Sequence, residues 1–173
     1  MAARVLVAYT SKKGSTAGIA EAVAKELKAR GLVVEVSTME TVTSLAAYDA
    51  VVLGVPVYTG RIMSPLALFV ARHRDALGKL PVAAFAAGIA PVFPKTGEVS
   101  QFTDQLSTAL QPVRPVSVTM FAGRLDPKNL SFVERGLTAL LKVPTGDFRD
   151  WKAIAAWAAE LPAKMGLSGR QQA

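Results

Sequence analysis

The stretch that decides the fold reads VLVAYTSKKGST and occupies residues 5–16. It begins with an apolar, β-branched run, Val5–Tyr9, which is typical of a β-strand. Hydroxyl side chains, two lysines and Gly14 follow, and they lead directly into a segment with helical spacing, Ser15–Arg30. A strand, a short polar loop and a helix therefore follow one another without a linker, as in the first part of a β-α-β unit.

The same alternation continues along the chain. Near-continuous apolar segments indicate strands that are covered on both faces, as in a parallel sheet. Such segments occur at Val5–Tyr9, Val33–Ser37, Ala50–Val57, Val82–Gly88 and Val116–Phe121. Helices are expected at Ser15–Arg30, Val42–Tyr48, Ser64–Leu77, Gly97–Leu110, Leu130–Leu141 and Asp150–Leu161. We therefore expect one α/β domain over residues 1–165, followed by a flexible tail, Gly166–Ala173.

The composition excludes several classes of protein. With 51% apolar and 19% charged residues, the 173-residue chain is too hydrophobic for intrinsic disorder. It has no cysteine, which excludes disulfides, thiolate catalysis and cysteine-ligated metals, and one histidine, His73, which excludes any site needing two imidazoles. Its longest apolar run, Leu80–Pro94, falls short of the about 20 residues of a membrane helix. No signal peptide is visible, so we expect a cytoplasmic protein.

The charge balance is basic, with 20 Lys plus Arg against 13 Asp plus Glu and a net charge of +7. The excess predicts either an ordinary basic surface or an anionic partner. Arg72, His73 and Arg74 form a short basic cluster. They predict a solvated face or, as the alternatives, a contact with an acidic protein or a peripheral contact with an anionic membrane surface at the inner face of the membrane. Nucleic-acid binding is not expected, because the aromatic residues lie on predicted core faces.

A ligand site is expected beyond the carboxyl ends of the strands, where the winding of such a sheet reverses. The strand order 2-1-3-4-5 brings three loops together there. The first, Thr10–Thr16, opens a helix, and its amides, hydroxyls and lysines favour a phosphate. It lacks the spacing of the nucleotide P-loop and of the dinucleotide-binding loop. The alternative interpretation is an ordinary capped start of a helix.

The other two loops are suited to a planar ligand. Tyr58 follows the third strand, and an aromatic ring stacked on a ligand adds about 0.5–1.5 kcal/mol beyond the buried area. After the fourth strand, the small residues Ala86, Ala87 and Gly88 let a ligand approach the backbone. The alternatives are a tyrosine packed at the domain edge and a close contact between strand and helix. Together, a phosphate loop beside an aromatic ring describes a site for flavin mononucleotide (FMN).

Several segments of the chain resemble those of a known protein family. The Thr10–Thr16 loop between strand and helix resembles the phosphate loop of the flavodoxin family, and Gly54–Gly60 resembles its second flavin loop. Phe121–Asp126 and Thr145–Trp151 are similar to segments of a flavodoxin-domain subgroup that includes menaquinone-dependent protoporphyrinogen oxidase. The resemblance covers residues 3–161. It implies a flavodoxin-like three-layer sandwich, with a five-stranded parallel sheet between helices, and one FMN per chain.

The resemblance also implies which residues bind FMN and which role some of them have. Tyr58 matches the aromatic that stacks on the isoalloxazine, and the Thr59–Gly60 peptide matches the one that hydrogen-bonds flavin N5. No metal site is expected. The full set of implied FMN-binding residues is Thr10, Ser11, Lys12, Lys13, Gly14, Ser15, Thr16, Pro56, Val57, Tyr58, Thr59, Gly60, Ala86, Ala87 and Gly88.

The chain departs from the low-potential flavodoxins, which are acidic around the flavin. Here Arg61 follows the second loop, and a cation near the flavin stabilises its reduced anion. That favours a quinone-linked oxidoreductase of the protoporphyrinogen dehydrogenase type, with a quinone or another redox partner. Phe93 is a candidate for the second stacking aromatic. The alternatives are a flavodoxin that carries single electrons and a flavin-free binding module on the same fold.

Overall fold

The computed structural model describes residues 2–11, 14–58, 61–62 and 65–167. Its strands are β1 Arg4–Tyr9, β2 Val33–Thr38, β3 Ala50–Tyr58, β4 Arg61–Ile62, β5 Val82–Gly88, β6 Ser117–Ala122, β7 Arg124–Leu125 and β8 Gly146–Asp147. Its α-helices are α1 Ser15–Ala29, α2 Pro65–Arg72, α3 Arg74–Leu77, α4 Val99–Leu110, α5 Phe132–Leu140 and α6 Trp151–Lys164. Single 3-10 turns occur at η1 Met39–Thr41, η2 Pro94–Thr96 and η3 Pro127–Asn129.

The main sheet has five parallel strands in the order β2-β1-β3-β5-β6, which confirms the predicted order 2-1-3-4-5. β1 lies between β2 and β3, with Val5 opposite both Val34 and Ala50. The winding reverses at β1, so the carboxyl ends of β1 and β3 border the crevice where ligands of such sheets bind. The short strand β4 pairs antiparallel with the end of β3, where Tyr58 lies opposite Arg61.

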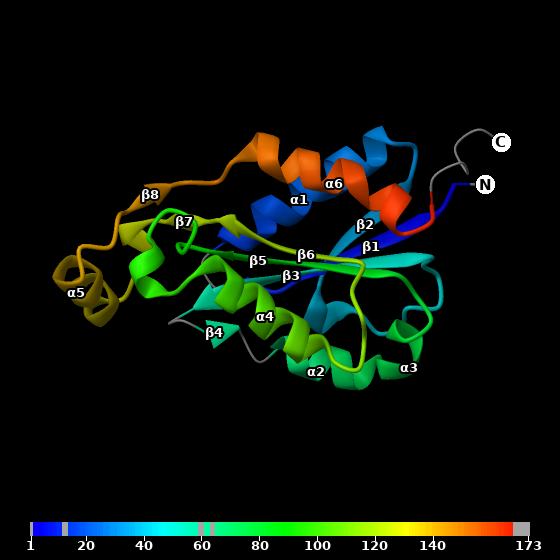
Figure 1. Ribbon diagram of the computed structural model, residues 1–173, viewed down its shortest axis with the longest axis horizontal. Helices are drawn as coiled ribbons and strands as arrows, with labels where there is room; N and C mark the ends of the chain where they lie inside the picture. Colours follow the sequence, from blue (N-terminus) through cyan, green and yellow to red (C-terminus); the bar gives the residue numbers. More distant parts are fainter. Residues whose placement is uncertain (1, 12–13, 59–60, 63–64, 168–173) are drawn as a thin grey trace.

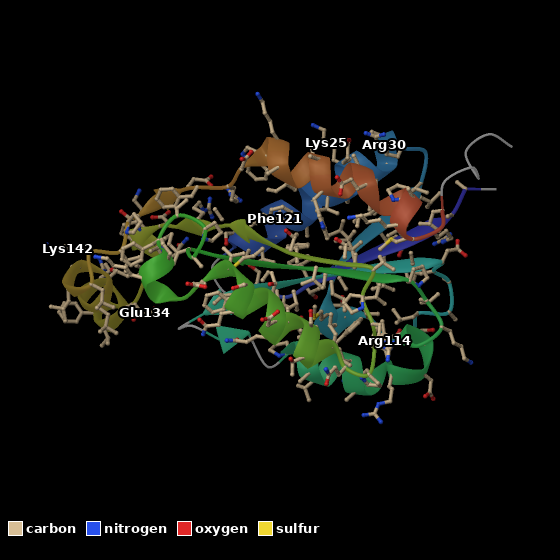
Figure 2. The ribbon with its side chains drawn as sticks, viewed as in Figure 1. Lys25, Arg30, Arg114, Phe121, Glu134 and Lys142 are labelled. Atoms are coloured by element: carbon tan, nitrogen blue, oxygen red, sulfur yellow. The ribbon has the colours of Figure 1, made fainter. Side chains whose placement is uncertain are left out.

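Helices cover both faces of the sheet, as expected. α1 and α6 lie on one face, and α2, α3 and α4 lie on the other (Figure 1). Successive strand residues point to opposite faces, so Val7 packs with α1 and α6 whereas Leu6 packs with the other layer. Phe121 lies in the first of these cores, with its ring centroid 5.6 Å from that of Trp157 on α6 (Figure 2). Burial on both faces explains the unbroken apolar runs.

One excursion leaves this sandwich between β6 and α6. β7 and β8 form a two-stranded antiparallel ribbon, with Arg124 opposite Asp147, and α5 lies between them in sequence. The ribbon and α5 extend from the end of the molecule at which the parallel strands finish (Figure 1). This places them next to the expected ligand edge. Within the described ranges, no helix is long and apolar enough to cross a membrane.

The helix expected at Val42–Tyr48 is wrong. The chain instead makes the η1 turn and then runs through bends and turns to β3. Val42 and Leu45 are nevertheless buried. The segment thus fills the core without helical backbone, and the β-branched neighbours of Val42 disfavour a helix there.

The helix expected at Ser64–Leu77 is interrupted. α2 ends at Arg72 and α3 begins at Arg74, with His73 between them at φ −111° and ψ 22°. The solvated position expected for His73 is also wrong, because its ring is buried with its centroid 4.6 Å from that of Phe69. Burial lowers the pKa of His73 below its usual 6.5. A hydrogen bond with the Val42 backbone raises the pKa, but its effect is smaller than that of burial. His73 is therefore a packed, neutral side chain.

The last helix was expected to stop before Pro162, and this boundary is wrong. α6 continues to Lys164 with Pro162 inside it. Leu161 and Pro162 are buried, and the Leu167 N–H donates to the Pro162 carbonyl oxygen over 2.7 Å. Packing of this turn outweighs the hydrogen bond that a proline cannot donate. Leu167 is buried as well, so the packed domain reaches past residue 165, and residues 168–173 lie outside the described part.

Candidate cofactor site

The loop after β1 is held by its own polar contacts. The Thr10 N–H donates to the Gly54 carbonyl oxygen over 3.0 Å, which ties the loop to β3. The Gly14 N–H donates to Ser11 Oγ, also over 3.0 Å, and closes the turn. Gly14 has φ 86°, a left-handed conformation that costs a residue with a Cβ about 1–2 kcal/mol. The sequence therefore places glycine where the chain turns into α1. Lys12 and Lys13 lie outside the described residues.

The start of α1 has the features of an anion site. Gly14 supplies no side-chain cap, so no described side chain occupies the amides of the first turn. These amides and the helix dipole favour a negative group. The Thr16 side chain is 1% exposed, and its hydroxyl has no hydrogen-bond partner among the described residues. A buried hydroxyl without a partner is costly, and a bound ligand oxygen removes that cost.

A cavity opens beside this helix start. One end carries Ser15, Thr16 and Arg124, and the remaining lining is mainly apolar, formed by Pro56, Val57, Ala87, Gly88, Ile89, Gly123 and Leu125. The cavity volume is about 70 Å³. This exceeds the about 10–15 Å³ that a cavity needs to hold one water molecule, and it suits a few waters or one small anionic group. A larger ligand has to extend outward past the second loop.

Arg124, at the start of β7, brings a cation to this cavity. A Cβ at Gly14 would lie 3.5 Å from Arg124 Nη2, so the guanidinium sits next to the helix start. Its Nε is buried and has no hydrogen-bond partner among the described residues. Arg124 Nε and Thr16 Oγ1 are thus two unsatisfied donors on residues that line the same cavity. Together they indicate an anionic ligand.

The backbone before Arg124 fixes its position. The Gly123 N–H donates to the Gly88 carbonyl oxygen over 2.9 Å, and the Phe148 N–H donates to the Gly123 carbonyl oxygen over 3.1 Å. A Cβ at Gly123 would lie 3.2 Å from Ser15 Oγ, which is closer than the site accommodates without a shift. Glycine at 123 therefore lets the turn after β6 pack directly against the start of α1.

The carboxylate opposite Arg124 in the ribbon is paired with another arginine. Asp147 lies opposite Arg124 in the β7–β8 ribbon, but it accepts two hydrogen bonds from the Arg149 guanidinium, over 2.8 and 2.7 Å. These bonds lower the pKa of Asp147 to about 2, with a smaller contribution from the charge of Arg124. Arg149 also lies over the Trp151 ring at 4.7 Å. Asp147 is thus bound to Arg149, and the guanidinium of Arg124 remains available to a ligand.

The structure brings together part of the predicted site. Ser15, Thr16, Pro56, Val57, Ala87 and Gly88 line the cavity, and Thr10, Ser11 and Gly14 shape the adjoining loop. Ala86 packs on the opposite face of the sheet and does not line it. Tyr58 ends β3, but its side chain and that of Arg61 lie outside the described part, as do Thr59 and Gly60. Phe93 is half-buried and is not among the lining residues.

Arg124, with Gly123, Ile89 and Leu125, was missing from the predicted set. The one signal for it was the similarity of Phe121–Asp126 to flavodoxin-domain proteins, which marked the segment without giving Arg124 a role. In the described part of the chain, no cluster of His, Asp or Glu could hold a metal ion.

Comparison with known proteins fits this geometry. A family model described as the flavodoxin domain matches residues 6–152. The chain belongs to the flavodoxin domain family. It is 23% identical over 171 residues to protoporphyrinogen IX dehydrogenase [quinone] of Escherichia coli K12, covering 91% of this chain and 94% of that protein.

Solved flavodoxins share its fold. A flavodoxin of Streptococcus pneumoniae superposes with a TM-score of 0.59 at 16% identity, over 94% of this chain and 99% of that one. A flavoprotein of Lactobacillus acidophilus, solved in complex with FMN, superposes with a TM-score of 0.54 at 16% identity, over 69% of this chain and 93% of that one. The chain therefore has the FMN-binding fold of the flavodoxins.

Proposed function

We propose that this flavodoxin-domain protein binds one FMN, with the phosphate at the start of α1, and acts as a quinone-linked oxidoreductase. The observation that carries the proposal is the pair of unsatisfied buried donors, Thr16 Oγ1 and Arg124 Nε, on residues lining one cavity at that helix start. A phosphate-sized anion satisfies both, together with the free amides of the first turn.

The residues present fit FMN. The phosphate carries up to two negative charges, and charge-assisted hydrogen bonds from a guanidinium and backbone amides are the strong ones. The apolar lining from Pro56, Val57 and Leu125 suits the less polar part of the ligand. The ring is expected at the outer edge, where Tyr58 ends β3 and the Thr59–Gly60 peptide follows it in the sequence. When bound, FMN supplies the electron and hydride chemistry, whereas the protein binds and orients it.

The charge of the site favours a two-electron reaction. The chain has a net charge of +7, and Arg61 follows the second flavin loop in the sequence, where the ring is expected. A positive group near the flavin stabilises its reduced anion, by up to about 4 kcal/mol for a separation of about 4 Å at an effective dielectric of about 20. A higher potential suits a quinone acceptor better than low-potential electron transfer. The similarity to a quinone-dependent protoporphyrinogen IX dehydrogenase gives protoporphyrinogen as the substrate to test first.

The visible spectrum of the purified protein is the first test. We expect a yellow protein, or a colourless one that takes up added FMN, and FMN-dependent oxidation of protoporphyrinogen IX with menadione as acceptor. Failure to bind FMN would favour a flavin-free binding module. FMN binding without quinone reduction, with two well-separated one-electron midpoint potentials, would favour a single-electron carrier.

A further inference from the structure

The helix α5 exposes an apolar face. Four apolar residues of the helix and its C-cap residue share one side, and they are between 52% and 86% exposed; they are Phe132, Val133, Leu137, Leu140 and Leu141. Their spacing is the i, i+1, i+4, i+5, i+8, i+9 pattern of one helix face, with Gly136 completing it. None of the residues of α5 is buried. We call this set the α5 apolar face.

The exposure does not come from a helix that is poorly formed. Ser131 and Glu134 make a full capping box, in which the Glu134 N–H donates to Ser131 Oγ over 3.1 Å. In return, the Ser131 N–H donates to Glu134 Oε1 over 2.9 Å. These contacts fix where α5 begins and use the only acidic side chain of the helix. The apolar face is therefore presented by an ordered helix.

The charge of the segment around α5 indicates which kind of partner could bind the α5 apolar face. Residues 128–142 contain the basic Lys128, Arg135 and Lys142 against the acidic Glu134, so the segment has a net charge of 3 − 1 = +2. All three basic side chains are exposed. Carbon side chains stand off α5 into open space beside Lys142 (Figure 2). Arg135 lies within α5, and Lys128 and Lys142 flank it in the sequence. A helix with an apolar face and basic side chains in and beside it is typical of segments that lie in the interface of an anionic membrane.

The dimensions of the face disfavour a second copy of the chain. Nine helical residues at about 1.5 Å each span about 14 Å, and a helix is about 10 Å wide, which gives a patch of about 140 Å². A stable protein–protein interface buries about 800 Å² on each partner. A lipid surface sets no such minimum, because it adapts to a single inserted helix.

The location of α5 relates the face to the cavity. Arg124 and Leu125 line the cavity and form β7, which pairs with β8 on the other side of α5 in the sequence. α5 extends from the same end of the molecule as the carboxyl ends of the parallel strands (Figure 1). A membrane bound by α5 would therefore lie at the end of the molecule that holds the proposed FMN site. This is where a lipid-soluble quinone would have to arrive.

We propose that the α5 apolar face docks the protein on an anionic phospholipid bilayer. The inference extends the proposed function, since it names the element that contacts the membrane. The α5 apolar face is distinct from the basic cluster at Arg72 and Arg74, for which the sequence favours a solvated face and leaves a membrane contact as an alternative. Lipid binding is measured without FMN or turnover, so the two proposals can fail separately.

Sedimentation with vesicles tests this docking. The full-length protein is mixed with vesicles of phosphatidylcholine containing about 30 mol% phosphatidylglycerol, whose negative surface potential attracts basic segments. We expect wild-type protein to bind these vesicles at least tenfold more strongly than vesicles of phosphatidylcholine alone. Phe132→Ser with Leu140→Ser should lower binding at least tenfold. The matched control is Leu68→Ser, which removes a 69% exposed leucine from α2 and should leave binding unchanged.

Two further measurements keep the outcome unambiguous. Lys128→Gln, Arg135→Gln and Lys142→Gln together should remove the preference for phosphatidylglycerol. The far-UV circular dichroism spectrum and the thermal unfolding midpoint should be nearly the same in every variant, which shows that each is folded. The proposal is overturned if wild-type protein does not bind the anionic vesicles, or if the Phe132→Ser, Leu140→Ser variant binds as wild type does. It is also overturned if sedimentation velocity shows a dimer that this variant dissociates.

Discussion

The substitution Arg124→Met tests how the protein holds the phosphate of FMN. Methionine keeps much of the length and apolar stem of arginine but removes the guanidinium, whose Nε is buried without a partner among the described residues. Nη2 lies next to the start of α1, 3.5 Å from where a Cβ of Gly14 would be. The variant should therefore lose one charged donor to the phosphate and little packing.

The size of the effect follows from that geometry. A hydrogen bond to a charged group contributes about 1.5–3 kcal/mol. At about 1.4 kcal/mol for each factor of ten, the Kd for FMN should rise about 10- to 100-fold. Riboflavin has the same ring and no phosphate, so its Kd should change by less than about threefold, which is under about 0.7 kcal/mol.

Flavin fluorescence quenching during titration of the apoprotein measures both constants. The control is Arg114→Met, an exposed arginine that lies away from the cavity (Figure 2) and should change neither Kd. Thermal unfolding should be nearly unchanged for Arg124→Met, because the substitution removes an unsatisfied buried donor. The reasoning is refuted if the two affinities fall equally, or if FMN binds the variant as tightly as the wild type.

Three more predictions concern stability, measured by urea unfolding. Gly14→Ala should lower the free energy of unfolding by about 1–2 kcal/mol, because φ is 86° at this position. Gly136→Ala should raise it by about 0.5–1 kcal/mol, because Gly136 lies in α5 with open space where the Cβ would be. Equal effects of the two substitutions would contradict the backbone argument. The folded pKa of His73 lies below 6.5, so the unfolded chain binds more protons and stability should fall as the pH drops below 6.5. His73→Asn should reduce this dependence of the unfolding free energy on pH. An unchanged dependence in the variant would show that His73 does not cause it. The pKa of Asp147 is lowered to about 2 in the folded protein, so this carboxylate should stabilise the fold above about pH 4. The stabilisation should be lost between pH 4 and 2. It should amount to about 1 kcal/mol or less, because the Asp147 side chain is 42% exposed. Asp147→Asn should remove that acid-range loss, and its persistence would place the loss elsewhere.

The strands were predictable from local sequence because their burial on two faces leaves a continuous apolar run. Val82–Gly88 was predicted at its observed bounds, and Val5–Tyr9 lacked only Arg4. The helix boundaries were harder. Pro162 is an expected stop, yet α6 passes through it because Leu161 and Leu167 on either side are held in the core. Such packing is set by residues distant in the sequence, and local propensity does not contain it.

The part of the site that is formed by neighbours in the sequence could be predicted. The part that the fold brings together from distant segments could not. Gly14, Ser15 and Thr16 are neighbours in sequence, and a loop between strand and helix implies their role. Arg124 reaches the same helix start only because β6 lies beside β5 and the Gly123 turn packs against α1. The exposure of the α5 apolar face could not be predicted either, because its apolar residues have the same spacing as those of a helix packed in a core. Only the fold shows that nothing in the described part of the chain covers it.

A crystal structure of the protein soaked or grown with FMN tests the central claim most directly. We expect the phosphate at the start of α1, with its oxygens within hydrogen-bond distance of the Thr16 hydroxyl and the Arg124 guanidinium. The ring should extend outward past Pro56 and Val57. A phosphate bound elsewhere, or a flavin that leaves Thr16 Oγ1 and Arg124 Nε without a partner, would contradict it.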